Sequence, residues 1–282
     1  MTTPNFGKVA VVAPAIKIKF WKDIYMGLSR GNVPFHLVFV GHVRPIFKLP
    51  PNFTYIYSDL PAAPCVEIAY RYVYKHIPDA KYVVNIADDL HLAPTLLEEL
   101  IKFYNKHKQN HSVDLLAVRP TCLMRSGEEN LMATHDGGPA LLAPNFTTIE
   151  NSKKIGGVDK RFIGIYWDCD RALRVHQLGG KIIFAGCDEV SPVSEIEHTP
   201  GLFVRYKNSD RPLLDSLWTY TESEDENNSL VSCASLTRAD TEYEQKFRRC
   251  RNELVFKNIM VQRKDDVQEF GDELNEYIRE KQ

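Results

Sequence analysis

Two adjacent carboxylates at the end of an apolar segment are the first residues in the chain that could do chemistry. A mostly apolar run leads directly into Asp88 and Asp89 in the segment YVVNIADDLHLAP (82–94). Like charges at the end of a buried strand repel each other and lose hydration, so we expect something cationic to stabilise them. One carboxylate could ligate a cation while the other accepts hydrogen bonds from a bound ligand. The pattern fits a helix N-cap followed by a turn aspartate equally well.

A second acidic pair and a histidine lie in the second half of the chain. Asp168 and Asp170 fall in the first turn of a helix expected over residues 167–178, where they lie on different faces, so at most one should face a ligand. Both could instead simply favour the helix dipole. His198 lies in EIEHTPG, and a lone histidine is more often structural than a ligand. Together, however, the two acidic pairs and the histidine could converge on one divalent cation and a reacting hydroxyl.

The elements that must position these residues alternate between strands and helices. Strands are expected at 8–14, 35–41, 53–59, 81–87 and 113–118, and helices at 19–31, 65–77 and 95–107. Strands that are apolar on both faces are typical of parallel sheets covered on both sides. The alternation predicts an α/β sandwich with a mainly parallel sheet, in which ligands bind beyond the carboxyl ends of the strands. Asp88 and Asp89 follow such an end.

Composition and charge exclude several classes of protein. The 282 residues include 35 basic and 37 acidic ones, so the net charge of -2 gives no reason to expect nucleic acid as a partner. The N-terminus lacks the pattern of a secretory signal, and no segment approaches the roughly 18 apolar residues of a membrane span. We therefore expect a soluble, cytoplasmic protein. Its six scattered cysteines predict reduced thiols rather than a zinc site or a disulfide framework.

The character of the sequence changes near residue 215. We expect one main domain over 1–214, which includes a loop-rich segment at 134–154, and an extension over 215–282. The extension begins with an acidic linker and continues with two charged segments, about 236–262 and 264–280, that are expected to be helical. These helices could contact a partner or a second copy of the chain and so form a homo-oligomer.

Read together, these segments resemble inverting glycosyltransferases of the GT-A fold, most of all glycosyltransferase family 2. The segment at 82–94 is similar to the DxD-type strand end of that fold. The second signature of the family is similar to IGGVDKRFIGIYWDCDRALRVHQLGGKIIFA, and its late histidine motif is similar to IEHTPG. The resemblance covers about residues 8–203. It implies a Rossmann-like α/β/α sandwich that binds a nucleotide sugar over residues 1–214, followed by a C-terminal helical extension.

The resemblance also implies a role for individual residues. Asp89 would bind a divalent metal, Mn²⁺ or Mg²⁺, on the donor diphosphate, and Asp88 would face the ribose or sugar of the donor. Asp168 falls at the position of the catalytic base, and Asp170 at that of a structural acid. His198 would reach the metal or the diphosphate and Arg71 would help to hold the donor, while Trp167 stands where the family commonly has a glutamate. We also expect Pro14, Ala15, Gly156 and Gly157 to contact the donor and Trp167 to contact the acceptor. The two glycines could also simply end a loop.

The sequence does not specify the donor or the acceptor. The family commonly carries aspartates after the second strand that read the nucleobase, whereas this chain has VGHVRP (40–45), so UDP, GDP and cytidine donors are all possible. Arg119, His135 and Asp136 could line an acceptor pocket, although loop residues of this kind are more often merely solvated. The acceptor could be a glycan, a protein or a small molecule.

The implied reaction is a single displacement at the anomeric carbon, with inversion and with Asp168 as general base. A rival of the same fold is a sugar nucleotidyltransferase, but PAIKIK (14–19) lacks the glycine-rich loop that cradles a triphosphate. A rival from another class is a non-catalytic GT-A-like module that binds sugar or scaffolds other proteins. The joint presence of Asp88, Asp89, Asp168 and His198 argues against that module, because it has no need for both a metal site and a base.

Overall fold

A seven-stranded sheet forms the centre of the computed structural model, which describes residues 6–110, 114–123, 145–159, 161–197, 202–219 and 237–238. The order of its strands is β3-β2-β1-β4-β8-β6-β9. The strands are β1 (Lys8–Pro14), β2 (Phe35–Gly41), β3 (Phe53–Tyr57), β4 (Ala80–Asn85), β6 (Leu116–Pro120), β8 (Asn145–Thr148) and β9 (Lys181–Ala185). Neighbouring strands are parallel except at β8, which runs antiparallel to both β4 and β6.

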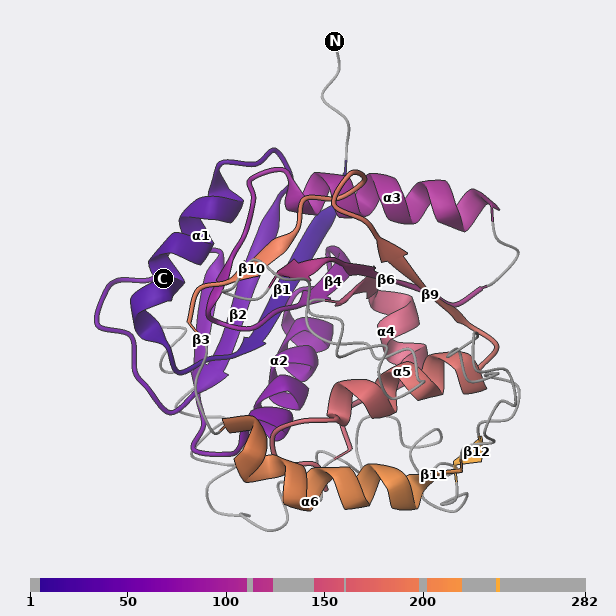
Figure 1. Cartoon of the computed structure of the whole chain (residues 1–282). Helices are drawn as coiled ribbons and strands as arrows, with labels where there is room; N and C mark the ends of the chain where they lie inside the picture. Colours follow the sequence, from indigo (N-terminus) through magenta and orange to yellow (C-terminus); the bar gives the residue numbers. More distant parts are fainter. Residues whose placement is uncertain are drawn as a thin grey trace.

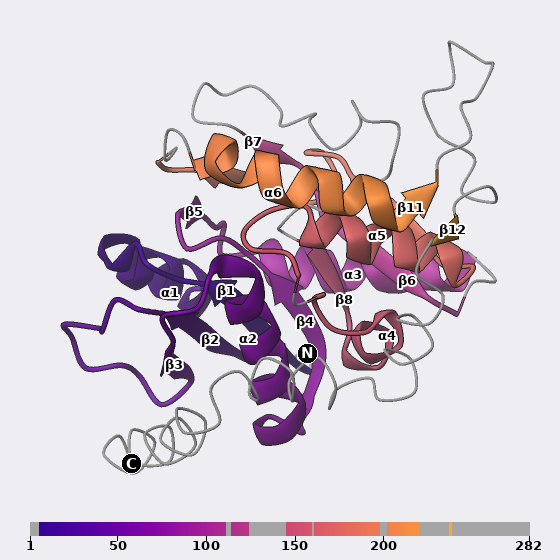
Figure 2. The ribbon, with the colours of Figure 1, turned by 90° about the horizontal axis from the view of Figure 1, so that it is seen from below.

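Helices cover both faces of the sheet (Figure 1). They are α1 (Trp21–Ser29), α2 (Ala62–His76), α3 (Leu96–Asn110), α4 (Ile149–Ile155), α5 (Trp167–Gln177) and α6 (Leu202–Leu217), with a short 3-10 turn, η1 (Ile18–Phe20), before α1. Helices α1 and α3 pack on one face, and α2, α4 and α5 on the other. Helix α6 lies alongside α5, outside this second layer (Figures 1 and 2).

The buried strands explain why the sheet forms here. Residues 9–13 of β1 and 37–41 of β2 are buried, because these apolar runs meet helices on both sides. The carboxyl ends of the two strands approach closely at Gly41, where a Cβ atom would lie 1.9 Å from the carbonyl oxygen of Ala15. On the side of α1, the indole of Trp21 is fully buried against the ring of Phe39.

The order of the strands fixes where a ligand can bind. The chain runs from β1 to β2 and β3 in one direction and then returns through α2 to β4, on the other side of β1. The order therefore reverses between β1 and β4. In open α/β sheets, ligands bind beyond the carboxyl ends of the strands at such a switch point. The segments that follow β1 and β4 thus form the expected binding region.

The predicted α/β sandwich with a mainly parallel sheet is confirmed, but several elements were missed, among them β8, α4 and α6. Residues 145–148 lie in the segment expected to be a loop, yet they form β8 between β4 and β6. Four residues are too few to show a periodic pattern. Helix α6 was also not predicted, because its sequence LFVRYKNSDRPLLDSL carries Pro212 in its interior, which lacks an N–H for the helix.

Smaller strands complete the described part of the chain. A three-stranded sheet joins β5 (Leu90–His91), β10 (Val193–Glu195) and β7 (Cys122–Leu123). Strand β11 (Trp218–Thr219) pairs with β12 (Thr237–Arg238). The first tail helix was expected over about 236–262, so this prediction is wrong at residues 237–238, which form a strand. The rest of the predicted tail helices lies outside the described residues. None of the described helices is both long enough and apolar enough to cross a bilayer.

Candidate functional site

Asp88 fastens the segment after β1 to the end of β4. Its Oδ2 accepts hydrogen bonds from the backbone N–H of Ile16 (2.6 Å), from that of Lys17 (2.5 Å) and from the indole Nε1 of Trp21 (3.0 Å). The side chain is buried, and burial raises the pKa of Asp88, while the three hydrogen bonds oppose that rise. The carboxylate therefore holds residues 16–21 at the switch point.

Asp89 forms an ion pair with the side chain of Lys17. The ammonium of Lys17 contacts Oδ2 of Asp89 and also donates to the carbonyl oxygen of Glu197 (2.9 Å). The backbone of Asp89 accepts a hydrogen bond from the N–H of Ile196 (2.8 Å). Only 15% of the Lys17 side chain and 11% of the Asp89 side chain are exposed. The cation expected beside the two aspartates is thus present, and the chain itself supplies it.

Further charged groups surround the thiol of Cys122, close to this ion pair. Burial raises the pKa of Cys122 to about 11, the charges of Glu195 and Asp89 add to the rise, and the guanidinium of Arg119 opposes it. Arg119, at the end of β6, is buried and lies over the ring of Phe184, with 4.9 Å between guanidinium carbon and ring centroid. The thiol is therefore protonated at neutral pH and inert as a nucleophile.

Asp168 lies in the first turn of α5 and is also buried. Burial raises the pKa of Asp168 to about 6, although backbone N–H groups of the turn and the positive charge of Arg119 favour the carboxylate. Arg119 thus acts electrostatically on both Asp168 and Cys122, which lies near Asp89. A carboxyl group with a pKa this close to neutrality can take up and release a proton under working conditions, as a general base must.

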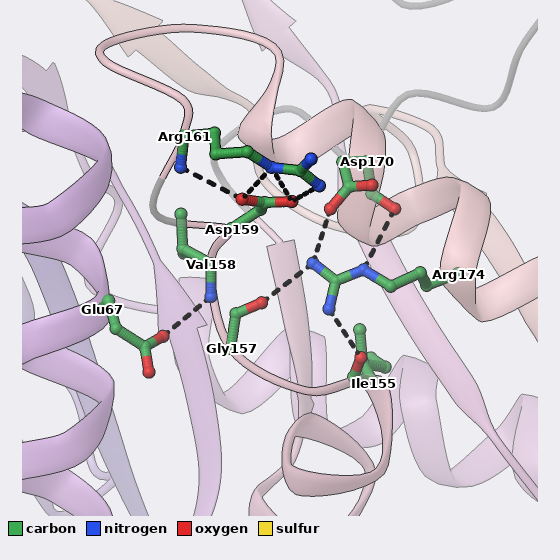
Figure 3. Close-up of polar contacts among 8 residues, drawn as sticks. All are labelled: Glu67, Ile155, Gly157, Val158, Asp159, Arg161, Asp170 and Arg174. Carbon is green, nitrogen blue, oxygen red and sulfur yellow. Dashed lines mark hydrogen bonds and ion pairs between the residues drawn. The ribbon is translucent and has the colours of Figure 1, made fainter. Parts of the chain in front are cut away.

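Asp170, two residues further along α5, is paired inside the fold. Its Oδ2 accepts a hydrogen bond from Nη2 of Arg174 (2.8 Å), and neither side chain is more than 1% exposed. Arg174 also donates to the carbonyl oxygens of Ile155 (3.0 Å) and Gly157 (2.8 Å), which joins α5 to the end of α4 (Figure 3). These contacts support the predicted structural role of this acid.

Glu67 of α2 approaches closely at Gly157, one of the two glycines predicted to bind the donor. A Cβ atom at Gly157 would lie 2.5 Å from Oε2 of Glu67, which accepts the backbone N–H of Val158 at 2.7 Å (Figure 3). Gly156 ends α4 with a φ of 91°, a conformation that favours glycine. Arg71 donates from Nε to Oε1 of Glu67 (2.6 Å). In this structure, both Gly157 and Arg71 contact the protein itself.

Helix α6 holds the loop that leads into α5. The buried carboxylate of Asp210 accepts hydrogen bonds from three successive backbone N–H groups, those of Ile163 (3.1 Å), Gly164 (2.8 Å) and Ile165 (2.9 Å). Three donors on one carboxylate form an anion-binding turn that the protein fills with its own side chain. The position of Asp168, three residues after this turn, therefore depends on α6.

The other predicted site residues are spread over several environments. Pro14 is half-buried and Ala15 buried where β1 ends, next to the segment held by Asp88. Trp167 is buried and packs in the hydrophobic core between α2, α5 and the sheet. His198 and Asp136 lie outside the described residues. Of the predicted site residues, the structure thus brings together Asp88 and Asp89 with Pro14 and Ala15 at the end of β1.

The donor set at Asp89 suits a divalent metal only when phosphate oxygens are also present. Among the residues that the structure describes, no three His, Cys, Asp or Glu side chains gather in a way that could hold a metal ion. Asp89 supplies a carboxylate that already contacts one cation. Mg²⁺ is commonly bound by one or two carboxylates together with substrate phosphates and water. Asp89 therefore fits a metal that is shared with a diphosphate.

Comparison with known proteins supports this architecture. No protein-family model and no curated protein matches the sequence. Among solved structures, the chain is similar to GalNAc-T7 with UDP, GalNAc and Mn²⁺, with a TM-score of 0.50, 12% identity, and coverage of 93% of this chain and 57% of that one. The chain has the GT-A fold.

Two further GT-A structures align with lower scores. Drosophila β1,4-galactosyltransferase 7, in complex with manganese, UDP-Gal and xylobiose, has 13% identity and a TM-score of 0.42, over 79% of this chain and 90% of that one. TarS of S. aureus has 10% identity and a TM-score of 0.46, over 74% of this chain and 40% of that one.

Two residues of this GT-A chain were missed by the sequence analysis. Lys17 lies in PAIKIK (14–19), which the sequence analysis used only to argue against a sugar nucleotidyltransferase, and Asp210 lies in none of the motifs named there. The available signal for Lys17 was its position, two residues after Ala15 at the carboxyl end of the first strand. No comparable signal existed for Asp210, which lies in a helix that the sequence did not predict.

Proposed function

We propose that the chain is a metal-dependent glycosyltransferase that moves a sugar from a nucleotide sugar to an acceptor hydroxyl. The observation that carries this proposal is the placement of Lys17, Asp88 and Asp89 at the switch point between β1 and β4, where α/β sheets bind ligands. The GT-A fold supports it, since the similar GalNAc-T7 structure contains UDP, GalNAc and Mn²⁺.

The donor lies against the ends of β1 and β4 in this proposal. Asp89, together with His198, would hold Mn²⁺ or Mg²⁺. When bound, the metal neutralises the charge that develops on the leaving diphosphate. Asp88 contacts the ribose or sugar of the donor through Oδ1, because its three hydrogen bonds to residues 16–21 all fall on Oδ2. The other proposed donor contacts are Pro14, Ala15, Arg71, Gly156 and Gly157.

Asp168 acts as the general base of a single displacement. The acceptor oxygen forms its bond to the anomeric carbon while the bond from that carbon to the diphosphate oxygen breaks, and the hydroxyl proton passes to Asp168. The configuration at the anomeric carbon inverts. The pKa of about 6 supports this role, because the group is mostly ionised at neutral pH yet basic enough to accept a proton. Arg119 and Asp136 are the proposed acceptor contacts, whereas Trp167 packs in the hydrophobic core instead.

The decisive experiment incubates the full chain with a panel of UDP-, GDP- and CDP-linked sugars and Mn²⁺, and measures slow hydrolysis to free nucleotide. We expect one donor class to be hydrolysed, the reaction to stop with EDTA, and Mn²⁺ to restore it. Asp89→Asn should remove the metal dependence together with the activity. Hydrolysis that is indifferent to chelator would refute the metal assignment. Nucleotide binding without hydrolysis or transfer would favour a non-catalytic sugar-binding module.

A further inference from the structure

Lys17 lies where a cation would be needed, and its backbone and side chain are held by different partners. Its N–H donates to Asp88, so the Cα atom is fixed at the end of β1. Its ammonium reaches Asp89 and the carbonyl oxygen of Glu197, the residue before His198. The side chain therefore connects the end of β4 with the segment after β10.

Simultaneous contact of an ammonium and a divalent metal with Asp89 is electrostatically unfavourable. The single negative charge of Asp89 would face three positive charges, and the two cations would repel each other in a region with little exposure to solvent. Lysine has a flexible four-carbon stem, so its ammonium can leave the carboxylate while the backbone stays in place. When a donor is bound, its diphosphate is the nearest anion that the ammonium of Lys17 can contact instead.

We propose that Lys17 is a resident cation that neutralises Asp89 before the donor arrives and moves to the donor's diphosphate when the metal takes Asp89. This inference rests on the proposed function and adds a donor-binding residue and a binding order to it. Metal alone must displace the ammonium, so it binds weakly. Metal together with a nucleoside diphosphate binds more tightly, because the displaced ammonium gains a charge-assisted hydrogen bond to phosphate. The two ligands are therefore cooperative, and the coupling is reciprocal.

Lys19 provides a matched control in the same segment. It has the same charge and pairs with the carboxylate of Glu197, but 62% of its side chain is exposed. Changing Lys17 or Lys19 to Met removes one positive charge and keeps the aliphatic stem. Only the first change removes the cation that contacts Asp89.

The first experiment measures the affinity of the full chain for Mn²⁺ alone, from the electron paramagnetic resonance signal of free Mn²⁺. We expect Lys17→Met to bind Mn²⁺ on the order of tenfold more tightly than the wild type, because no ammonium has to be displaced. Lys19→Met should stay within about twofold of the wild type, since an exposed pair contributes little. Unchanged affinity in Lys17→Met would overturn the inference.

The same titration with saturating UDP, and separately with GDP, measures the coupling. In the wild type, the nucleotide that binds should tighten Mn²⁺ binding. In Lys17→Met this gain should shrink by about tenfold, because the lysine–phosphate contact is lost. A wild type that binds no Mn²⁺ with or without nucleotide would refute the proposed function itself, together with this inference. Normal binding with the same coupling in Lys17→Met would refute only the role of Lys17.

A second measurement uses the wild-type chain and does not depend on how the variant folds. Acetic anhydride labels accessible lysine amines, and mass spectrometry compares Lys17 with Lys19 in the same sample. We expect labelling of Lys17 to rise when Mn²⁺ is added alone and to fall again when nucleotide is added with Mn²⁺, while labelling of Lys19 changes little. Labelling of Lys17 that is unaffected by bound Mn²⁺ would contradict the exchange.

Discussion

The end of β4 and the first turn of α5 each present two carboxylates, and the two regions treat them in a similar way. In each region one acid is committed to the fold: Asp88 accepts three hydrogen bonds from residues 16–21, and Asp170 pairs with Arg174. The other acid of each pair, Asp89 or Asp168, is the one assigned to chemistry.

The two regions differ in what surrounds the acid that is assigned to chemistry. Asp89 pairs with a lysine on a flexible stem, whereas burial leaves Asp168 with a pKa raised to about 6. The structural acid Asp170 instead meets a guanidinium that is itself 1% exposed and fixed to two backbone carbonyls. Asp89, whose lysine partner can move, can thus exchange that partner for another ligand. Asp170, whose arginine partner is buried and hydrogen-bonded to the backbone, cannot.

The largest expected effect comes from a change at Asp168, the acid of α5 that is assigned to chemistry. Asp168→Asn should lower turnover by about 10²–10⁴-fold, because general base catalysis contributes that much and the amide cannot accept the proton. Steady-state kinetics on the donor found in the panel measures this, with circular dichroism to show that the fold is kept. Turnover equal to that of the wild type would remove Asp168 from its role.

The structural acid of the same helix should respond in stability instead. Asp170→Asn leaves the buried guanidinium of Arg174 without its counter-charge, so the free energy of unfolding should fall by about 3–5 kcal/mol. Urea denaturation measures the change. Glu98→Gln, which breaks a more exposed pair with Lys102, is the matched control and should change little. A small loss in Asp170→Asn, similar to the control, would contradict the structural assignment.

The pH dependence of stability should also distinguish Asp168. The folded protein keeps a proton on this group up to about pH 6, whereas the unfolded chain releases it near pH 4, so folding stability falls as pH rises between these values and is level above them. Asp168→Asn lacks this loss and should be more stable than the wild type by up to about 3 kcal/mol at pH 7.5, with the advantage gone at pH 4. Denaturation curves at the two pH values measure it, and an advantage that does not depend on pH would contradict the raised pKa.

Asp88→Asn should have the smallest effect of the series. The amide oxygen can still accept hydrogen bonds, so only the charge-assisted part is lost and the free energy of unfolding should fall by about 1–2 kcal/mol. Affinity for Mn²⁺ should stay within about threefold of the wild type, because Asp88 is not the metal ligand in this proposal. Loss of Mn²⁺ binding in this variant would show that Asp88, and not Asp89, binds the metal.

Much of this architecture could be predicted from the sequence, because its signals are local. The strands around 8–14, 35–41 and 81–87 are long apolar runs, and the helices between them show helical spacing. Strand β8 could not be predicted in the same way, since its position between β4 and β6 depends on partners far away in the sequence.

The candidate site was predictable only in part, for the same physical reason. Acidic residues at the ends of elements pointed to Asp88, Asp89, Asp168 and Asp170. The ion pair of Asp89 with Lys17 joins residues 72 apart, and no local pattern encodes it. Similarly, the hydrogen bonds of Asp210 to the loop before α5 join residues 45–47 apart. Sequence patterns identified the acids, and the tertiary structure identified what neutralises them.

The central claim is that Asp89 holds the metal that joins the nucleotide to the switch point between β1 and β4. Isothermal titration of UDP and GDP into the wild type, Asp88→Asn and Asp89→Asn, each with Mn²⁺ and with EDTA, tests it most directly. We predict that Mn²⁺ strengthens nucleotide binding in the wild type and in Asp88→Asn but not in Asp89→Asn. Binding to Asp89→Asn that Mn²⁺ strengthens as much as in the wild type would contradict the claim.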